Sequence, residues 1–67
     1  MAIGETIREY RKKRNLTQKQ LGELSGTSES TIKQYELGKR QPRIEQLKKI
    51  AEALGVTEWH IMYGMTD

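Results

Sequence analysis

The sequence predicts an all-α fold, a compact bundle of five short helices in a single domain over residues 1–67. Apolar residues recur three and four positions apart along the chain, which is the spacing of one face of a helix. Polar capping residues and glycines divide the chain into short segments, and no stretch alternates apolar and polar residues over the length of a strand. We expect the helices at about residues 2–14, 17–24, 28–37, 44–54 and 58–63.

The first two helices are separated by Asn15. Asparagine tolerates the left-handed conformation that commonly ends a helix, so the first helix is expected to stop near this residue. Its inward face is predicted to carry Ile3, Ile7 and Tyr10. Thr17 precedes Gln20 by three positions, the pattern of a capping box, and so marks the start of the second helix. Leu21 and Leu24 are expected to face inward from it.

A short polar break containing Gly26 leads to the third helix, with Ser28 as its N-cap and Gly38 just beyond its end. Two helices of about two turns each, joined by a short turn, form a helix-turn-helix, predicted here over residues 17–37. In that arrangement the second helix enters the major groove of DNA. The pattern therefore indicates a DNA-binding surface on the third helix.

The fourth helix follows a basic loop that contains Pro42, a residue that cannot continue a helix. Its apolar stripe is predicted to consist of Ile44, Leu47, Ile50, Ala51 and Leu54. Gly55 is expected to end this helix, Thr57 to cap the fifth, and Gly64 to close the fifth. Tyr10 and Tyr63 are expected at the edge of the core.

Composition narrows the possible functions. The chain of 67 residues has no cysteine, one histidine and a net charge of +3. A lone histidine without companion ligands predicts no metal site, and we expect no cofactor and no enzymatic activity. No long apolar run suggests a signal peptide or a membrane span, so a cytoplasmic protein is expected. Two basic clusters suit contacts with a polyanion: Arg8, Arg11, Lys12, Lys13 and Arg14 before residue 15, and Lys39, Arg40 and Arg43 around Pro42.

The exposed face of the third helix holds the candidate base-contacting residues Ser28, Glu29, Ser30, Lys33 and Gln34. Gln34 has the shape for a bidentate pair with adenine, and Lys33 suits guanine or phosphate. Serine hydroxyls bond to either kind of base. Glu29 has two interpretations: it accepts a hydrogen bond from cytosine, or it stabilises the helix start, where the macrodipole favours negative charge.

A larger set of residues resembles the DNA-binding domains of phage repressors and Cro proteins, the Xre-like regulators. The match covers residues 3–64 and includes Gly4-Glu5-Thr6-Ile7-Arg8, Arg11, Leu16-Thr17-Gln18, Leu21, Gly26, Ile32, Tyr35-Glu36, Gly38-Lys39, Pro42 and Ala53-Leu54-Gly55-Val56. The resemblance implies a lambda-repressor-like fold and a bacterial or phage-encoded, nucleoid-associated regulator. Gly22 departs from the family, which usually has alanine there, and is expected to cost the second helix up to about 1 kcal/mol.

The resemblance also implies roles for residues outside the third helix. Contacts with the DNA backbone fall to Thr17 and Gln18 at the start of the second helix, and to Lys39, Arg40 and Arg43 in the basic loop. The glutamine that Gln18 matches also braces the recognition helix. An ion pair is implied between Arg11 and Glu36, although an exposed Arg11 would instead be free to reach a phosphate.

The predicted partner is double-stranded operator DNA, bound by a homodimer, with no membrane and no small-molecule ligand. Trp59 is either an exposed residue of the dimer interface or a cap over the core below the fourth helix. The leading hypothesis is a transcriptional repressor that reads a two-fold operator. The alternative is a protein-interaction module with the same fold, such as an antitoxin or an adaptor.

Overall fold

The computed structural model describes residues 3–64, and this part of the chain contains five α-helices and no strand. The helices are α1 (Ile3–Lys13), α2 (Gln18–Leu24), α3 (Glu29–Glu36), α4 (Ile44–Leu54) and α5 (Glu58–Met62). The predicted all-α class is confirmed, and each predicted helix end within the described range agrees to within one residue. The predicted start at Ala2 lies outside the described residues.

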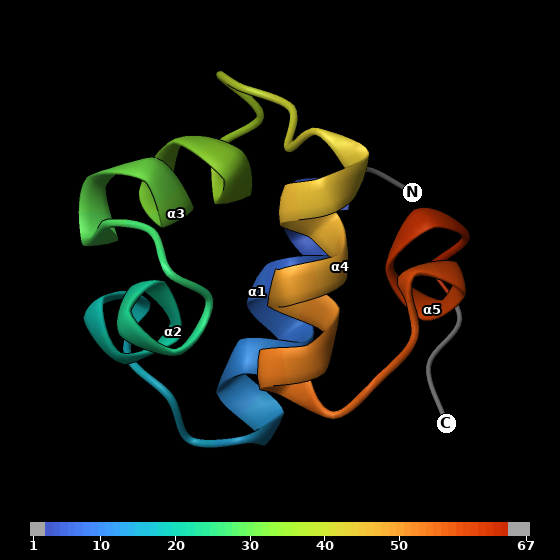
Figure 1. Cartoon of the computed structure of the whole chain (residues 1–67), viewed down its shortest axis with the longest axis horizontal. Coiled ribbons are helices and arrows are strands. Elements are labelled where there is room, and N and C mark those ends of the chain that lie inside the picture. The colour runs from blue at the N-terminus through green and yellow to red at the C-terminus, as the bar shows by residue number, and fades with distance from the viewer. Residues whose placement is uncertain (1–2, 65–67) are drawn as a thin grey trace.

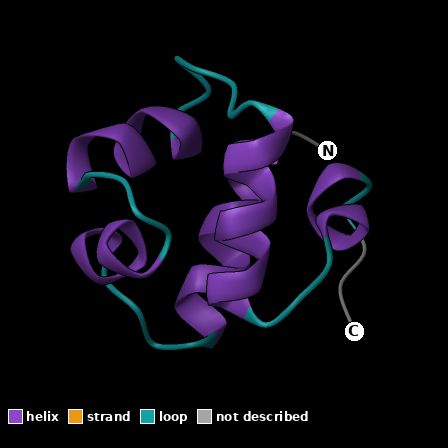
Figure 2. Ribbon diagram, in the orientation of Figure 1, coloured by secondary structure: helices purple, strands orange, loops and turns teal. Residues whose placement is uncertain are grey.

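The helices surround a central pair. In Figure 1, α4 lies in front of α1 in the middle and contacts it, α2 and α3 lie on one side of this pair, and α5 lies on the other. Figure 2 shows that short loops join all five helices. Since α1 contacts α3, α4 and α5, it is the element against which both sides of the molecule pack.

Local hydrogen bonds define the helix ends that the sequence predicted. Thr17 and Gln20 form a reciprocal capping box: the Thr17 hydroxyl accepts from the Gln20 amide at 3.0 Å, and the Gln20 side chain accepts from the Thr17 amide at 2.8 Å. Thr57 caps α5 in the same way, with His60 as its partner. Asn15 has a φ of 57°, the left-handed conformation expected at the end of α1. These contacts satisfy backbone groups that have no partner within a helix.

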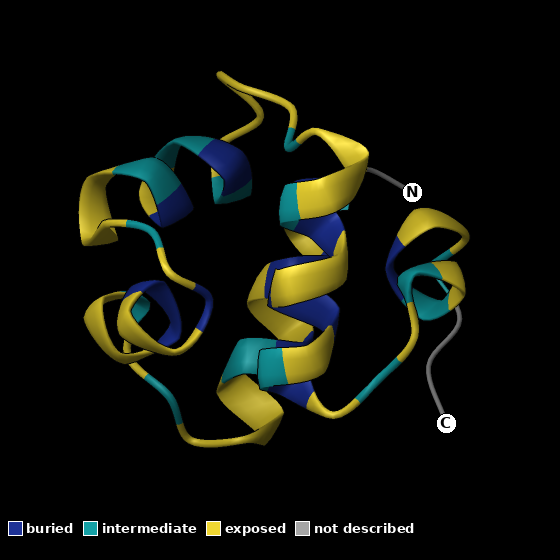
Figure 3. Cartoon of the chain, in the orientation of Figure 1, coloured by how far each residue is buried: buried dark blue, intermediate teal, exposed yellow. Residues whose placement is uncertain are grey.

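The core is continuous across the five helices, as the buried residues in Figure 3 show. Its buried members are Ile7, Tyr10, Leu21, Ile32, Tyr35, Leu47, Ile50, Ala51, Leu54 and Ile61. Leu47, Ile50, Ala51 and Leu54 form the predicted stripe of α4, so this helix is oriented as its sequence predicted.

The inward placements of Leu24 and Ile44 and the placement of Tyr63 at the edge of the core are wrong. Leu24 is 62% exposed because α2 buries the face that carries Leu21 and Gly22, and Leu24 lies to one side of that face. Ile44 is 54% exposed because it is the first residue of α4 and lies at the edge of the core. Tyr63 is 61% exposed and stacks on Trp59, whereas Tyr10 is fully buried.

Gly4 sets the distance between α1 and the end of α3. It is buried, and a Cβ atom at this position would overlap the carbonyl oxygen of Tyr35 and lie 3.0 Å from that of Glu36. Both obstacles are backbone atoms, which cannot rotate away as a side chain does. The packing of α1 against α3 therefore requires glycine here.

We expect Gly4→Ala to destabilise the domain although alanine favours a helix by about 1 kcal/mol. Overpacking against fixed backbone costs about 1–3 kcal/mol or more and separates the two helices. Urea unfolding followed by circular dichroism measures the change, with Glu9→Ala, at an exposed position of α1, as the control. A Gly4→Ala variant as stable as the wild type would show that α1 shifts without cost.

Candidate nucleic-acid interface

The two helices of the helix-turn-helix approach closely because of Gly22. A Cβ atom at this position of α2 would lie 2.9 Å from the carbonyl carbon of Ser28 and 3.1 Å from the amide nitrogen of Glu29. The carbonyl of Gly22 also accepts a hydrogen bond of 2.8 Å from the amide of Thr27 in the turn. The expectation that Gly22 only weakens α2 was thus incomplete, because glycine allows the start of α3 to lie directly against α2.

Two side-chain hydrogen bonds stabilise this turn, one from within the helix-turn-helix and one from α4 outside it. The buried hydroxyl of Ser25 donates to the carbonyl of Leu21 at 2.7 Å, and Gln46 of α4 donates to the Ser25 carbonyl at 3.3 Å. Gln46 was not predicted as part of this site. It is one of several polar residues of α4, and nothing in the neighbouring sequence indicates a hydrogen bond to a distant turn. α4 thereby helps to position α3.

The outer face of α3 consists mainly of accessible polar side chains. Glu29, Ser30 and Lys33 are exposed, and Gln34 is partly exposed. Among residues 3–64, none of these four side chains has an ion pair or a hydrogen bond within the protein. Their polar groups are therefore free to bind groups outside the molecule.

Ser28 differs from the other predicted base-contacting residues. Its hydroxyl oxygen accepts from the amide of Thr31 at 3.1 Å and donates its hydrogen to the Thr31 hydroxyl at 2.9 Å. Ser28 is thus the N-cap of α3, as its position predicted. One lone pair of the oxygen remains for an external donor, whereas its hydrogen is already used.

The loop from α3 to α4 presents the second basic cluster. Gly38 has a φ of 76°, and its amide donates to the Tyr35 carbonyl at 3.1 Å, while the Lys39 amide donates to the Gln34 carbonyl at 2.9 Å. These two bonds form a Schellman motif, which turns the chain sharply at the end of the helix. Lys39, Arg40 and Arg43 are all exposed in the loop that follows. Three cations therefore lie in the loop that joins α3 to α4.

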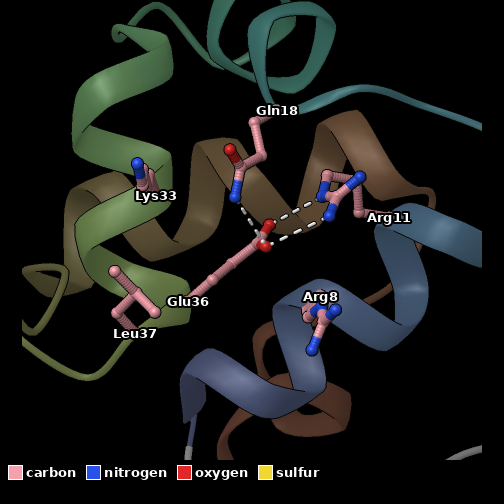
Figure 4. Close-up of a pocket in the computed structure, with 6 residues that line it drawn as sticks. All are labelled: Arg8, Arg11, Gln18, Lys33, Glu36 and Leu37. Atoms are coloured by element: carbon pink, nitrogen blue, oxygen red, sulfur yellow. Dashed lines mark hydrogen bonds and ion pairs between the residues drawn. The ribbon is translucent and has the colours of Figure 1, made fainter.

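Glu36 lies at the centre of a polar network that joins α1, α2 and α3 (Figure 4). Arg11 donates from Nε to Glu36 Oε2 at 2.7 Å and from Nη2 to Oε1 at 3.2 Å, and Gln18 donates from Nε2 to Oε1 at 3.0 Å. The side chains of Arg11 and Glu36 are only 12% and 3% exposed. The ion pair implied by the resemblance is present in the structure.

Arg11 has a further bond within the protein, from Nη1 to the carbonyl of Leu16 at 2.7 Å. Three of its nitrogens thus bind internal acceptors, which leaves little of the guanidinium for a phosphate. Arg14 is used in a similar way, because its Nε donates to the carbonyl of Leu54 at the end of α4 at 2.9 Å. The first basic cluster is therefore partly structural, and its two internally bonded arginines stabilise the packing of α1.

An open hollow of about 410 Å³ adjoins the network, lined by Arg8, Arg11, Gln18, Lys33, Glu36 and Leu37. Arg8 reaches it from α1 and Lys33 from α3. Arg8 was predicted only as a member of the first basic cluster, without a role of its own. Its spacing of three residues before Arg11 was the available signal that both lie on one face of α1.

Trp59 lies on the surface, so its alternative placement as a cap over the core is wrong. It is 62% exposed, and its ring stacks on that of Tyr63 with centroids 4.9 Å apart. Met62 is 40% exposed on the same short helix, while Ile61 is fully buried in the core. α5 therefore presents exposed aromatic rings on the opposite side of the molecule from α2 and α3 (Figure 1).

Residues 3–64 lack the features of two other kinds of site. This part of the chain has no group of three or more His, Cys, Asp or Glu side chains that could hold a metal ion. It also has no helix that is long and apolar enough to cross a membrane.

We expect Arg11→Met and Glu36→Leu each to lower the free energy of unfolding by about 3 kcal/mol, because each leaves a desolvated charge without its partner. The double variant is expected to lose less than the two single variants together, with a coupling of about 2 kcal/mol. Chemical denaturation of all four proteins gives the cycle. Lys12→Met, at an exposed position of the same helix, is the control; additive losses would contradict the coupling.

Comparisons with known proteins agree with this geometry. The helix-turn-helix family model matches residues 7–58. The chain is 41% identical over 63 residues to the transcriptional repressor RghR of Bacillus subtilis (92% of this chain, 47% of that protein), and 36% identical over 64 residues to the transcriptional activator BcrR of Enterococcus faecalis (96% and 31%). It thus spans less than half the length of these two curated relatives.

Among solved structures, the chain resembles the P22 c2 repressor crystallised in complex with a synthetic operator. The TM-score is 0.91 and the identity 32%, over 97% of this chain and 98% of that one. The resemblance to phage repressors is therefore confirmed in both sequence and fold. With a family model matched over most of its length, the chain belongs to the helix-turn-helix family.

Proposed function

We propose that this protein is a transcriptional repressor that binds duplex DNA sequence-specifically, with α3 in the major groove. One observation carries the proposal: α3 ends the helix-turn-helix with an exposed face of unpaired polar side chains, and a basic loop follows it directly. A groove-reading helix requires this combination, because base edges take polar side chains and the flanking phosphates take cations. The solved relative in complex with an operator supports it.

The proposed base-contacting residues are Glu29, Ser30, Lys33 and Gln34, whose polar side-chain groups are unpaired within residues 3–64. Gln34 offers both a donor and an acceptor to adenine, while Glu29 accepts from cytosine or stabilises the helix start. Ser28 contributes less than a free serine would, because its hydroxyl caps α3.

The proposed backbone contacts are Lys39, Arg40 and Arg43 in the loop after α3, and Thr17 and Gln18 at the start of α2. Gln18 is held by Glu36, so any phosphate it meets is placed relative to α3 as well as to α2. Phosphate contacts of this kind fix the register of the recognition helix on the duplex without reading its sequence.

Exposed aromatic rings at α5 and its C-cap support binding as a homodimer. Trp59 and Tyr63 are each more than 60% exposed, and aromatic residues are enriched in protein interfaces. A two-fold dimer would place two recognition helices about 34–36 Å apart, one turn of DNA, and would require a palindromic operator. The proposed site of action is the bacterial cytoplasm.

The alternative of a protein-interaction module is less well supported. Such a module would need apolar anchors on α3, and Leu37 is the one exposed large apolar side chain at that helix. Repression is favoured over activation because RghR and the solved P22 c2 protein are both named as repressors, whereas BcrR is named as an activator. Catalysis is not part of the proposal, since the candidate site consists of residues suited to binding.

Selection of bound duplexes from a random pool is expected to enrich a palindrome. Gln34→Ala is expected to lower discrimination between that palindrome and other sequences by about 1–3 kcal/mol, since a bidentate base contact is lost. Arg43→Ala is expected to weaken binding to all duplexes alike and to reduce the salt slope by about 1. Binding isotherms at two salt concentrations measure both. A pool without enrichment would contradict sequence-specific binding.

Trp59→Ala is expected to reduce cooperative binding to the palindrome while leaving affinity for a single half-site unchanged, because α5 lies away from α3. Analytical ultracentrifugation with and without the half-site measures self-association directly. Leu24→Ala is the matched control, since Leu24 is also 62% exposed but lies on α2. Equal loss of cooperativity in the two variants would exclude α5 as the interface.

A further inference from the structure

We propose that the hollow between α1, α2 and α3 binds a phosphate of the DNA backbone, with Arg8 as a phosphate-binding residue and Lys33 as its counterpart. This inference rests on the proposed function, because the duplex supplies the phosphate. It adds a contact from α1, a helix outside the helix-turn-helix, and changes the main role of Lys33 from base reading to backbone binding.

The charges around the hollow favour an anion. Glu36 is the one acidic residue in its lining, and its carboxylate already accepts hydrogen bonds from Arg11 and Gln18. The charges of Arg11 and Glu36 balance. Arg8 and Lys33 have no ion pair with any other of residues 3–64, so the hollow has an excess of two positive charges. Two unpaired cations in the lining of an open hollow attract a phosphate, whose oxygens accept hydrogen bonds from cationic side chains.

The place of the hollow suits a phosphate beside the groove that α3 would enter. Lys33 belongs to the exposed face of α3, four residues after Glu29, and Gln18 is the first residue of α2. Arg8 comes from α1 on the other side of the Glu36 carboxylate (Figure 4). A strand that runs along the edge of α3 would therefore meet Lys33 first and Arg8 beside it.

The rim of the hollow favours a nucleotide over a free phosphate ion. Leu37 lines the hollow and is 59% exposed, at the C-cap of α3. A backbone phosphate brings a deoxyribose whose carbon atoms could cover this side chain, whereas orthophosphate has no apolar surface. The pairing of two cations with one exposed leucine thus fits the alternating charged and apolar groups of a DNA strand.

The experiment compares Arg8→Gln and Arg8→Lys with Lys49→Gln, which removes a charge from an exposed position of α4 outside the hollow. Dissociation constants are measured for the selected palindrome and for a random duplex between 50 and 200 mM salt. We expect Arg8→Gln to weaken both duplexes by a similar factor, about fivefold, and to reduce the salt slope by about 1. Arg8→Lys is expected to restore the slope, and Lys49→Gln to match the wild type.

Two further measurements separate the outcomes. Thermal melting shows whether each variant is folded, and titration of orthophosphate followed by the amide signals of Gln18 and Lys33 tests a free anion. Arg8→Gln and Lys49→Gln with equal effects on DNA would overturn the proposal. An orthophosphate site that needs Arg8, with DNA affinity unchanged, would also overturn it in favour of a free ligand. A wild-type protein that binds no duplex refutes the proposed function itself, before any variant is compared.

Discussion

The position of α3 depends on one buried carboxylate. The side chain of Glu36 is 3% exposed and accepts hydrogen bonds from Arg11 of α1 and Gln18 of α2. A desolvated charge is stable only when its partners occupy fixed positions, so these bonds determine where the recognition helix lies as well as how strongly it is held. Arg11 also binds the carbonyl of Leu16, which connects the same network to the turn between α1 and α2.

Close backbone packing at two glycines also positions α3. Gly4 lets α1 lie against the end of α3, and Gly22 lets α2 lie against its start. The recognition helix is thus held at both ends by neighbours that approach as closely as backbone atoms allow. A domain of this size buries little surface, so small gains in packing are a large share of its stability. The helix propensity lost at Gly22 is offset by this contact.

Two chemically different surfaces lie on opposite sides of the molecule. The side that carries α2 and α3 has unpaired polar residues and cations, whereas α5 has exposed aromatic rings. The central helices α1 and α4 lie between the two sides (Figure 1). For a protein that reads two half-sites, this arrangement would set their spacing.

The helices, their caps and most of the core could be predicted from the sequence, because capping residues and apolar spacing act within one or two turns of chain. The capping box of Thr17 and the left-handed Asn15 are examples. By contrast, the surface positions of Leu24 and Trp59 and the bond from Arg14 to the end of α4 became known from the packed structure. The packed structure also shows that Arg8 and Lys33 share one hollow. These features depend on residues far apart in the chain, whose distances are fixed only when the helices pack.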